Sequence, residues 1–450
     1  MSENNIELEE KKGLNFGDEI TKFIQHLEAQ TEIVPFVMEL VAAKLIQESK
    51  DVDKYIKENN LEEENNDDKK EKNNSIKLLI PSDKFKEFID LDKKVETTLL
   101  AYNLLPINFI VSFVSQYDAF LGNLIKTIFY HKPELLNNSD KNLSFSEIIS
   151  YDSIEDIKDY IIEKEVESVI RENHLKQFKW LESKLKIPLR KDLPSFKHFI
   201  EITERRNLFV HNNGVVSRQY IENCTKNEVP NIDKVKVGDK LSVNPGYFVK
   251  CYSILFEIGV KLGQVIWRKL LPDELEEADN HLNNICFDLL IKGHYHLASN
   301  LLSFATETLK KHYDQEIINI FIINKSLSYY LSGKKEKAKS VLSKQDWSAT
   351  NDKFKLAIAV LNEDFNEAID LMKSIGSSNK HINKDAYREW PLFKEFRKRD
   401  DFKKAYKEIF NEEFIYIEKK PKNIEDILHY IKHIKKETEK EEKAANKGYT

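Results

Sequence analysis

The sequence predicts an all-α fold, and composition is the first reason. Glycine (12 residues) and proline (11 residues) are scarce among the 450 residues, although average usage would give roughly 31 and roughly 22. Because sheets joined by tight turns use both residues freely, this scarcity argues against all-β folds and Rossmann-type nucleotide-binding folds. Charged residues form 32% and hydrophobic residues 41% of the chain, which is typical of helices with one solvated face.

The N-terminal part predicts helices followed by a charged linker. Residues 1–50 are expected to form N-terminal helices: 17–50 carry apolar side chains at helical spacing, and Pro35 is expected to divide them into two helices. The run of Glu, Asn, Asp and Lys at 62–74 has no apolar face. We therefore expect residues 51–77 to form a disordered linker.

Residues 78–271 predict a helical bundle with a charged insertion near 134–172. Pro106 is expected to open one helix, and residues 247–270 form a strongly apolar helix. A further helix over 195–212 ends in Asn-Asn-Gly, which is typical of a left-handed C-terminal cap.

An internal repeat predicts stacked helical hairpins over 272–410. Ala298, Ala338 and Ala368 are 40 and 30 residues apart, and each follows an aliphatic-x-Gly/Glu pattern at the same offset. Periods of this size indicate helical hairpin arrays. Over about 285–375 the pattern resembles tetratricopeptide (TPR) repeats in degenerate form, which implies a surface that binds a protein partner or an activating trigger.

The remaining features indicate a cytoplasmic protein without cofactor or metal. Residues 411–450 are a charged tail, and the net charge of −6 gives no global attraction for nucleic acid. The three cysteines are widely spaced and form no CxxC motif, so neither a zinc site nor a disulfide framework is expected. The N-terminus is polar and acidic, unlike a secretory signal, and the most apolar run, 104–114, is shorter than the roughly 18 residues of a membrane span.

The helix over 195–212 carries the strongest chemical signal. Arg206, Asn207 and His211 lie just before its end, and Asn207 and His211 share a face because they are four residues apart. An imidazole can move a proton near neutral pH, and a guanidinium can hold a phosphate. Together they are a plausible pair for RNA cleavage.

The string Arg206-Asn207-x₃-His211 resembles the signature of the HEPN superfamily, in which a histidine follows an arginine after four to six residues. The surrounding sequence is similar to HEPN families of prokaryotic defence and toxin systems. The resemblance covers about 80–270 apart from the charged insertion. It implies an all-α bundle that forms a homodimer through the bundle, and a metal-independent endoribonuclease whose two motifs meet across the dimer.

The resemblance also implies roles for individual residues. His211 would transfer a proton at a ribose 2′-OH, Arg206 would hold the scissile phosphate, and Asn207 would orient His211 or the phosphate. The products would be a 2′,3′-cyclic phosphate and a 5′-OH. Arg205 and Asn212 are further candidates for supporting roles. Asp118 is a candidate acidic partner from an earlier helix of the bundle, and it is suggested by helix order and not by a motif.

Two other interpretations remain open at this point. Arg206 and His211 would be structural if arginines of this helix end pair with Glu201 or Glu204, and the chain would then be a non-catalytic scaffold whose bundle dimerises and whose repeats bind protein. Alternatively, the bundle would bind nucleotide or nucleic acid without cutting it.

Overall fold

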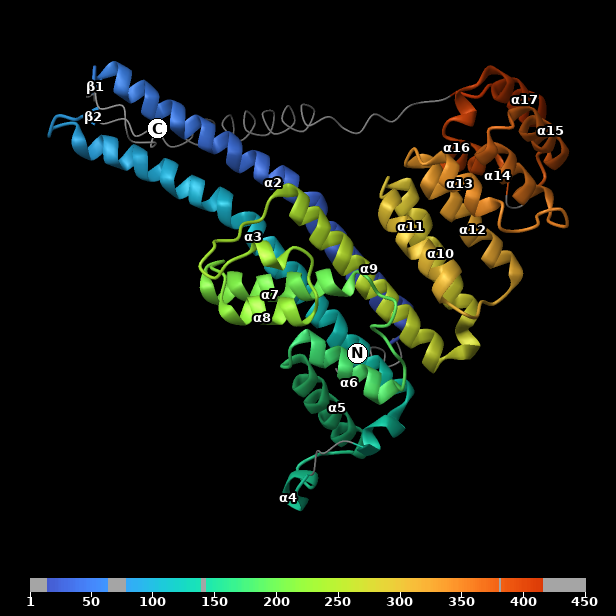
Figure 1. Cartoon of the computed structure of the whole chain (residues 1–450), viewed down its shortest axis with the longest axis horizontal. Helices are drawn as coiled ribbons and strands as arrows, with labels where there is room; N and C mark the ends of the chain where they lie inside the picture. The colour runs from blue at the N-terminus through green and yellow to red at the C-terminus, as the bar shows by residue number, and fades with distance from the viewer. Residues whose placement is uncertain (1–13, 64–77, 139–142, 380–381, 416–450) are drawn as a thin grey trace, which may run out of the picture. The chain divides into compact units, whose positions relative to one another are not determined.

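The computed structural model describes residues 14–63, 78–138, 143–379 and 382–415. Over these ranges the chain is helical apart from one short antiparallel pair, in which β1 (Glu62–Glu63) lies beside β2 (Leu78–Leu79). The prediction of an all-α fold is therefore confirmed (Figure 1). The contacts divide the chain into two compact units.

The first unit contains residues up to Leu289 together with His294–Phe321. Its α-helices are α2 (Phe16–Glu58), α3 (Phe85–His131), α4 (Phe145–Ile148), α5 (Ile154–Ile170), α6 (His174–Leu185), α7 (Phe196–Asn212), α8 (Arg218–Lys226), α9 (Pro245–Leu270), most of α10 (Leu275–Ile291), and α11 (Tyr295–Ser303). Short 3₁₀ turns are η1 (Pro133–Asn138), η2 (Ile232–Lys234) and η3 (Pro272–Glu274), and η4 (Phe304–Thr308) is a π-helix.

The helices α2 and α3 are paired antiparallel along their whole length. The rings of Phe23 and Phe120 stack with centroids 4.6 Å apart, and nearer the β1–β2 end Lys44 Nζ donates to Thr98 Oγ1 at 3.1 Å. This register places Pro35 almost opposite Pro106.

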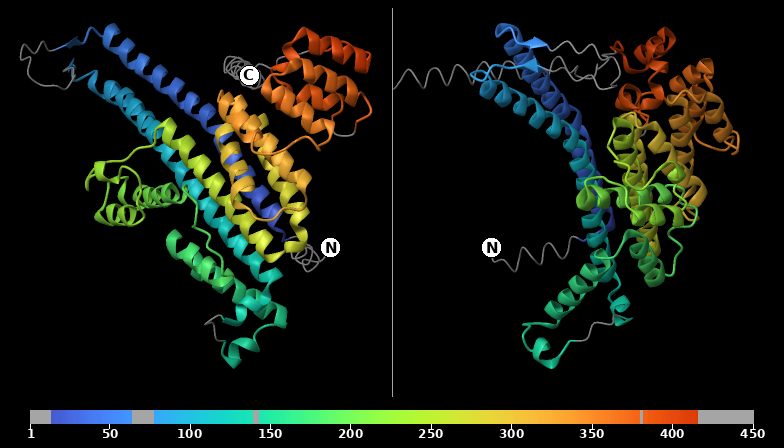
Figure 2. Two further views of the ribbon diagram at one scale, coloured as in Figure 1. Left: turned by 45° about the vertical axis from the view of Figure 1, so that its right-hand side comes forward. Right: turned by 60° about the vertical axis from the view of Figure 1, so that its left-hand side comes forward.

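Both prolines lie inside continuous helices, so the prediction that they divide or open helices is wrong. Each proline removes one backbone hydrogen bond, but the two helices remain paired beyond it, where Lys44 contacts Thr98, and their main apolar contact lies on the other side of the prolines, where Phe23 packs on Phe120. Figure 2 shows the paired helices curving together, as long helices that wrap around a core commonly do.

The helix α2 also extends beyond residue 50, where the linker was predicted to begin. It continues to Glu58, and Leu61 is buried beyond its end. The first part of the predicted linker 51–77 is therefore ordered helix, and residues 64–77 lie outside the described residues. The N-terminal helix is also part of the bundle rather than a separate element, because α2 packs on α3 and α9.

The helix α9 completes the core of the first unit. Gly259 and Gly263 are one turn apart on α9 and face α2. A Cβ added at Gly259 would overlap the ring of Phe23, and one added at Gly263 would lie 2.6 Å from Ile20 Cγ1. The two glycines therefore allow α9 and α2 to approach more closely than any larger residue would permit.

Four more helices surround this core. The predicted charged insertion near 134–172 includes α5, which packs on α3 and buries Ile162, Val166 and Val169. The helix α7 also packs on α3, and α6 and α8 pack beside α7.

The second unit contains Leu290–Gly293 and the chain from Ile322 onward. The helix α12 (Gln315–Leu331) contributes to both units, and the remaining helices are α13 (Lys335–Leu342), α14 (Asp352–Asn362), α15 (Phe365–Ile375), α16 (Lys384–Glu389) and α17 (Asp400–Phe410), with 3₁₀ turns η5 (Pro391–Phe393) and η6 (Phe396–Lys398). Residues 416–450 of the predicted tail lie outside the described residues.

The repeat corresponds to three helical hairpins, α10–α11, α12–α13 and α14–α15. Its three turn positions all have left-handed backbone, with φ of 82° at Gly293, 78° at Gly333 and 65° at Glu363. The three repeat alanines, Ala298, Ala338 and Ala368, are fully buried. The predicted domain boundary at residue 272 differs from the observed one, because the first hairpin, α10–α11, belongs mainly to the first unit.

Of the described helices, α3 is the one that is long and apolar enough to cross a membrane, judged by length and composition alone. Of the residues in the apolar stretch of α3 that passes this test, 22% are buried. The second half of α3 belongs to the core of the bundle, with Phe113, Tyr117 and Phe129 fully buried.

We predict that Gly259→Ala destabilises the first unit by about 1–3 kcal/mol, because the new methyl group overlaps Phe23. Thermal unfolding followed by circular dichroism measures this. Gly246→Ala on the same helix is the matched control, since its Cβ would meet no atom closer than 3.5 Å and alanine favours the helix. Equal melting temperatures for the two variants would contradict the close approach of α9 and α2.

Candidate functional site

The end of α7 is fixed by a glycine cap. Asn213 and Gly214 both have left-handed backbone, with φ of 48° and 77°, as the Asn-Asn-Gly signal predicts. A Cβ on Gly214 would lie 2.9 Å from the carbonyl oxygen of Leu241. Leu241 N donates to Gly214 O at 2.9 Å, and Val215 forms a β-bridge with Lys240. The segment before α9 therefore anchors the helix end that carries His211.

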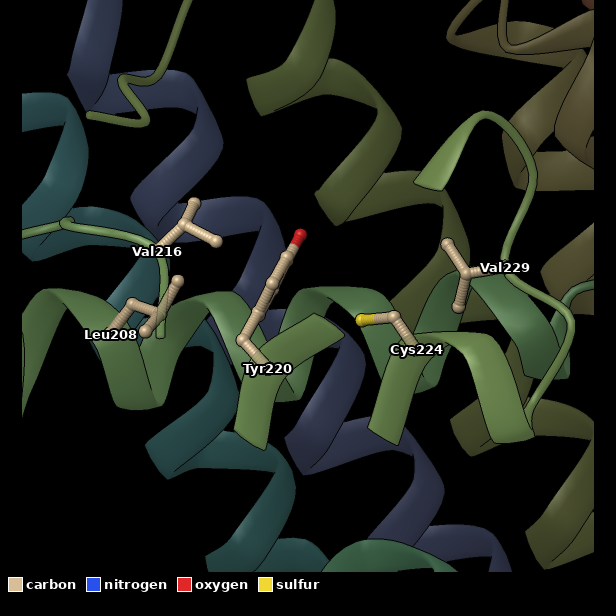
Figure 3. Close-up of a cluster of buried hydrophobic side chains, with 5 residues drawn as sticks. All are labelled: Leu208, Val216, Tyr220, Cys224 and Val229. Atoms are coloured by element: carbon tan, nitrogen blue, oxygen red, sulfur yellow. The ribbon is translucent and has the colours of Figure 1, made fainter. Parts of the chain in front are cut away.

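A cluster of buried side chains holds α8 and the following loop against α7. Figure 3 shows its five members: Leu208, Val216, Tyr220, Cys224 and Val229. Burial raises the pKa of the Cys224 thiol to about 12, and likewise that of Cys251. Neither sulfur is therefore a thiolate at neutral pH, which excludes both as activated nucleophiles.

Arg206 pairs with Asp118 of α3. Its Nη2 donates to Asp118 Oδ2 at 2.9 Å, and the side chains are 20% and 22% exposed. The pair joins α7 to α3 across 88 residues of sequence. Arg206 Nε is buried and has no hydrogen-bond partner among the described residues, so the guanidinium is only partly satisfied.

His174 completes this cluster, and the sequence analysis missed it. Its Nε2 lies 2.9 Å from Asp118 Oδ1. Because a carboxylate only accepts hydrogen bonds, Nε2 must carry the proton in this pair. The side chain is buried between the rings of Tyr117 and Phe199. As a single histidine after the helix-capping Asn173, it gives no sequence signal that points to Asp118.

His211 is exposed at the end of α7. Within the part of the chain that the structure describes, we find no hydrogen bond or ion pair from His211 or from Asn207, and none that joins either to Arg206. Asn212 Nδ2 donates to Val215 O at 2.6 Å and so supports the turn after the helix. A single chain thus brings Arg206 to Asp118 but leaves His211 unengaged.

Arg205 is part of a buried network centred on Glu201. Its Nε donates to Glu201 Oε1 at 2.6 Å, and its guanidinium lies 3.9 Å from the ring centre of Tyr247. The hydroxyls of Tyr220 and Tyr247 also donate to Glu201, at 2.9 and 3.0 Å. Burial, and then the charge of Glu201, raises the pKa of both tyrosines, so both remain donors.

One of the arginine–glutamate pairs considered from the sequence is therefore present, and it joins Arg205 to Glu201. Glu204, the other acid considered, instead accepts a hydrogen bond from Asn223 Nδ2 at 3.0 Å. Arg206 takes no part in either contact and faces α3.

A separate hollow of about 460 Å³ lies between the start of α7, α9, α11 and η4. Its floor is Glu257, which accepts hydrogen bonds from Ser195 at 2.9 Å, Lys261 at 2.6 Å and Asn300 at 3.0 Å. These four polar groups bond to one another, and His198, His296 and Glu307 also line the hollow. In the described ranges, no group of three or more His, Cys, Asp or Glu side chains is arranged to hold a metal ion.

Comparison of the chain with protein-family models, curated proteins and solved structures finds no match.

We predict that Glu201→Gln destabilises the protein by about 3 kcal/mol or more, because it leaves the buried charge of Arg205 without a counterion. Urea denaturation measures the change. Glu204→Gln on the same helix is the control, since its side chain keeps an oxygen that accepts from Asn223. If the two variants lose the same stability, the network around Glu201 does not hold the end of α7.

Proposed function

We propose that the protein is a metal-independent endoribonuclease of the HEPN type. The observation that supports this most directly is the Arg206–Asp118–His174 cluster, which fixes a guanidinium on the helix that presents an unengaged histidine. His211 follows Arg206 by five residues, about 7.5 Å along the helix axis and about 140° around it. Arg206 is turned toward α3, whereas His211 points to solvent.

The proposed reaction uses the RNA's own hydroxyl as nucleophile. His211 in its neutral form removes the proton of a ribose 2′-OH, and the oxygen attacks the adjacent phosphorus. The bond from phosphorus to the 5′ oxygen breaks, and that oxygen takes up a proton, so the products are a 2′,3′-cyclic phosphate and a 5′-OH. Arg206 stabilises the charge on the phosphoryl oxygens, and Asn207 orients His211 or the phosphate.

The proposal includes a homodimer formed through the bundle, because one chain does not bring His211 and Arg206 into contact. In the dimer, a second copy's motif would supply the missing side of the site. The helical hairpins of α10–α15 would bind the protein partner or trigger that controls cleavage, as the TPR resemblance implies. The resemblance also suggests a role in a prokaryotic defence or toxin system.

The second candidate is a non-catalytic scaffold that dimerises through the bundle and binds protein through the repeats. The same ion pair favours it, because Asp118 neutralises Arg206 and both side chains are largely buried. An arginine that serves only to join α7 to α3 would show this geometry too.

We predict that His211→Ala lowers RNA cleavage by about 100-fold or more, the usual range for a general acid–base group. The fold should persist, because the side chain is exposed. Cleavage of a labelled RNA in EDTA, with analysis of product ends, measures the effect. Val210→Ala, at the exposed neighbouring position, is the control and should retain activity.

Two results would contradict this prediction. Full activity in His211→Ala would show that the proton is moved elsewhere. Cleavage that depends on Mg²⁺ and leaves 5′-phosphate ends would indicate another nuclease chemistry.

Arg206 distinguishes the two candidates, because its variants have separable effects on stability and cleavage. Arg206→Lys keeps a positive charge near Asp118 but loses the planar fork that binds phosphate. We expect it to reduce cleavage at least tenfold while costing less than about 1 kcal/mol of stability. A wild-type protein that is folded and dimeric but never cleaves RNA would instead support the scaffold.

A further inference from the structure

The hollow between the start of α7, α9, α11 and η4 lies wholly within the first unit. Its volume of about 460 Å³ falls within the range of roughly 300–1,000 Å³ that small-molecule sites occupy. The lining comes from four separate elements, and most of the lining side chains are polar. Pockets in which polar groups converge from several elements are the usual location of ligand sites.

Two helices each present one face to this hollow. On α9, Ile254, Glu257 and Lys261 are three and four residues apart, and on α11, His296 and Asn300 are four residues apart. Residues at these steps share one side of a helix. The hollow is therefore formed by two facing helices and closed at one end by the start of α7.

The π-helix η4 supplies another part of the wall. Leu309 N donates to Phe304 O at 3.0 Å, which is a hydrogen bond between residues five apart. Phe304, Glu307 and Thr308 of this wider turn all line the hollow. Single turns of π-helix are rare in proteins and occur frequently at functional sites.

Glu257, on the floor of the hollow, has an acceptor position to spare. Its side chain is 6% exposed. Oε1 accepts hydrogen bonds from Ser195 and Lys261, whereas Oε2 accepts a single hydrogen bond within the part of the chain that the structure describes, from Asn300. Because a carboxylate offers about four acceptor positions, Oε2 can accept another donor. A buried Glu–Lys pair is also weak evidence for stability, so stability alone gives little reason for this pair.

Charge decides the class of ligand. Three carboxylates line the hollow against one ammonium group: Asp192, Glu257 and Glu307 against Lys261. With histidines counted as neutral, the lining therefore has a net charge of −2. A cleft lined by one sign of charge concentrates ligands of the opposite sign. Phosphates and carboxylates are thus repelled, and an organic cation is favoured.

His198 of α7 does not offset this charge. Burial, and then the nearby charge of Lys250, lowers the pKa of His198. The imidazole is therefore neutral at pH 7, and it adds one hydrogen-bond donor and one acceptor to the lining.

The carboxylates lie at two depths, which indicates the shape of the cation. Glu257 is buried, whereas Asp192 and Glu307 are exposed, and Ile254 and Phe304 add apolar surface. In the described ranges, no group of three or more His, Cys, Asp or Glu side chains is arranged to hold a metal ion, so a compact metal ion does not fit. A methylene chain with an ammonium group at each end can contact the carboxylates at both depths and the apolar wall together.

We propose that the hollow binds an aliphatic polyamine, with one ammonium group on Glu257 Oε2 and another at Asp192 and Glu307. The bound amine would join α9, η4 and the start of α7 by charge-assisted hydrogen bonds. The inference goes beyond the ribonuclease proposal and does not depend on it, because the lining of the hollow shares no residue with the Arg206–Asp118–His174 cluster.

The first test removes the exposed charges. Spermidine is titrated into the full chain by isothermal calorimetry at fixed ionic strength, in the absence of RNA. The wild-type protein should bind one spermidine, and Asp192→Asn with Glu307→Gln should raise the dissociation constant at least about tenfold, because charge-assisted hydrogen bonds are lost. Asp233→Asn with Glu222→Gln removes two exposed charges elsewhere in the first unit and should bind as the wild-type protein does.

The second test fills the hollow without changing any charge. Ser303 is half-buried and lines the hollow. Ser303→Phe should raise the dissociation constant for spermidine at least about tenfold by occupying the space of the ligand. Ser303→Ala, the matched control, keeps the space open and should retain binding. Circular dichroism and the melting temperature without ligand show that each variant is folded.

Three results would overturn the proposal. One is the absence of saturable spermidine binding to the wild-type protein. Another is equal affinity of the Asp192→Asn, Glu307→Gln variant and its control, which would show only a general attraction of the cation to an acidic chain. The third is tighter binding of adenosine monophosphate than of spermidine, which would show that the hollow accepts an anion.

Discussion

The helix α3 is the surface on which α2, α5, α7 and α9 all pack, and the candidate site depends on this packing. Asp118 lies between His174 of α6 and Arg206 of α7, on the part of α3 that is buried in the bundle. Next to Asp118, the rotation of α3 is fixed by its packing on α2, where Phe23 contacts Tyr117 and Phe120. The register of the α2–α3 pair therefore sets which face of α3 carries the carboxylate toward α7.

The sequence predicted correctly those features that depend on a few adjacent residues, such as helix caps and turns. The cap at Asn213 and Gly214 could be predicted because only a residue tolerant of positive φ ends a helix in this way. The three repeat turns followed from the same constraint, although the third uses Glu363 rather than glycine. The prolines misled because their cost is local, about 3 kcal/mol in a helix interior, whereas the packing that offsets it extends over the whole α2–α3 contact.

The candidate site was only partly visible in the sequence. Arg206 and His211 belong to one short motif, but the Asp118 contact spans 88 residues, and helix order alone suggested it. His174 could not have been found, since one histidine at the start of a helix has no pattern around it. Arg205 shows that neighbours in the sequence can have different surroundings. It is adjacent to Arg206, yet a rotation of 100° about the helix axis places it against Glu201 and Tyr247 instead of α3.

The two prolines also have a mechanical consequence. Each lacks the amide hydrogen that would bond the carbonyl four residues earlier, so both helices lose an axial bond at the same level and the pair is most compliant there. From Pro35 to the end of α2 at Glu58 the distance is about 35 Å, and a bend of about 10° would move the far end by about 6 Å. When a force acts on the β1–β2 end of the two helices, we therefore expect the pair to bend at Pro35 and Pro106 and to stay straight on either side of them.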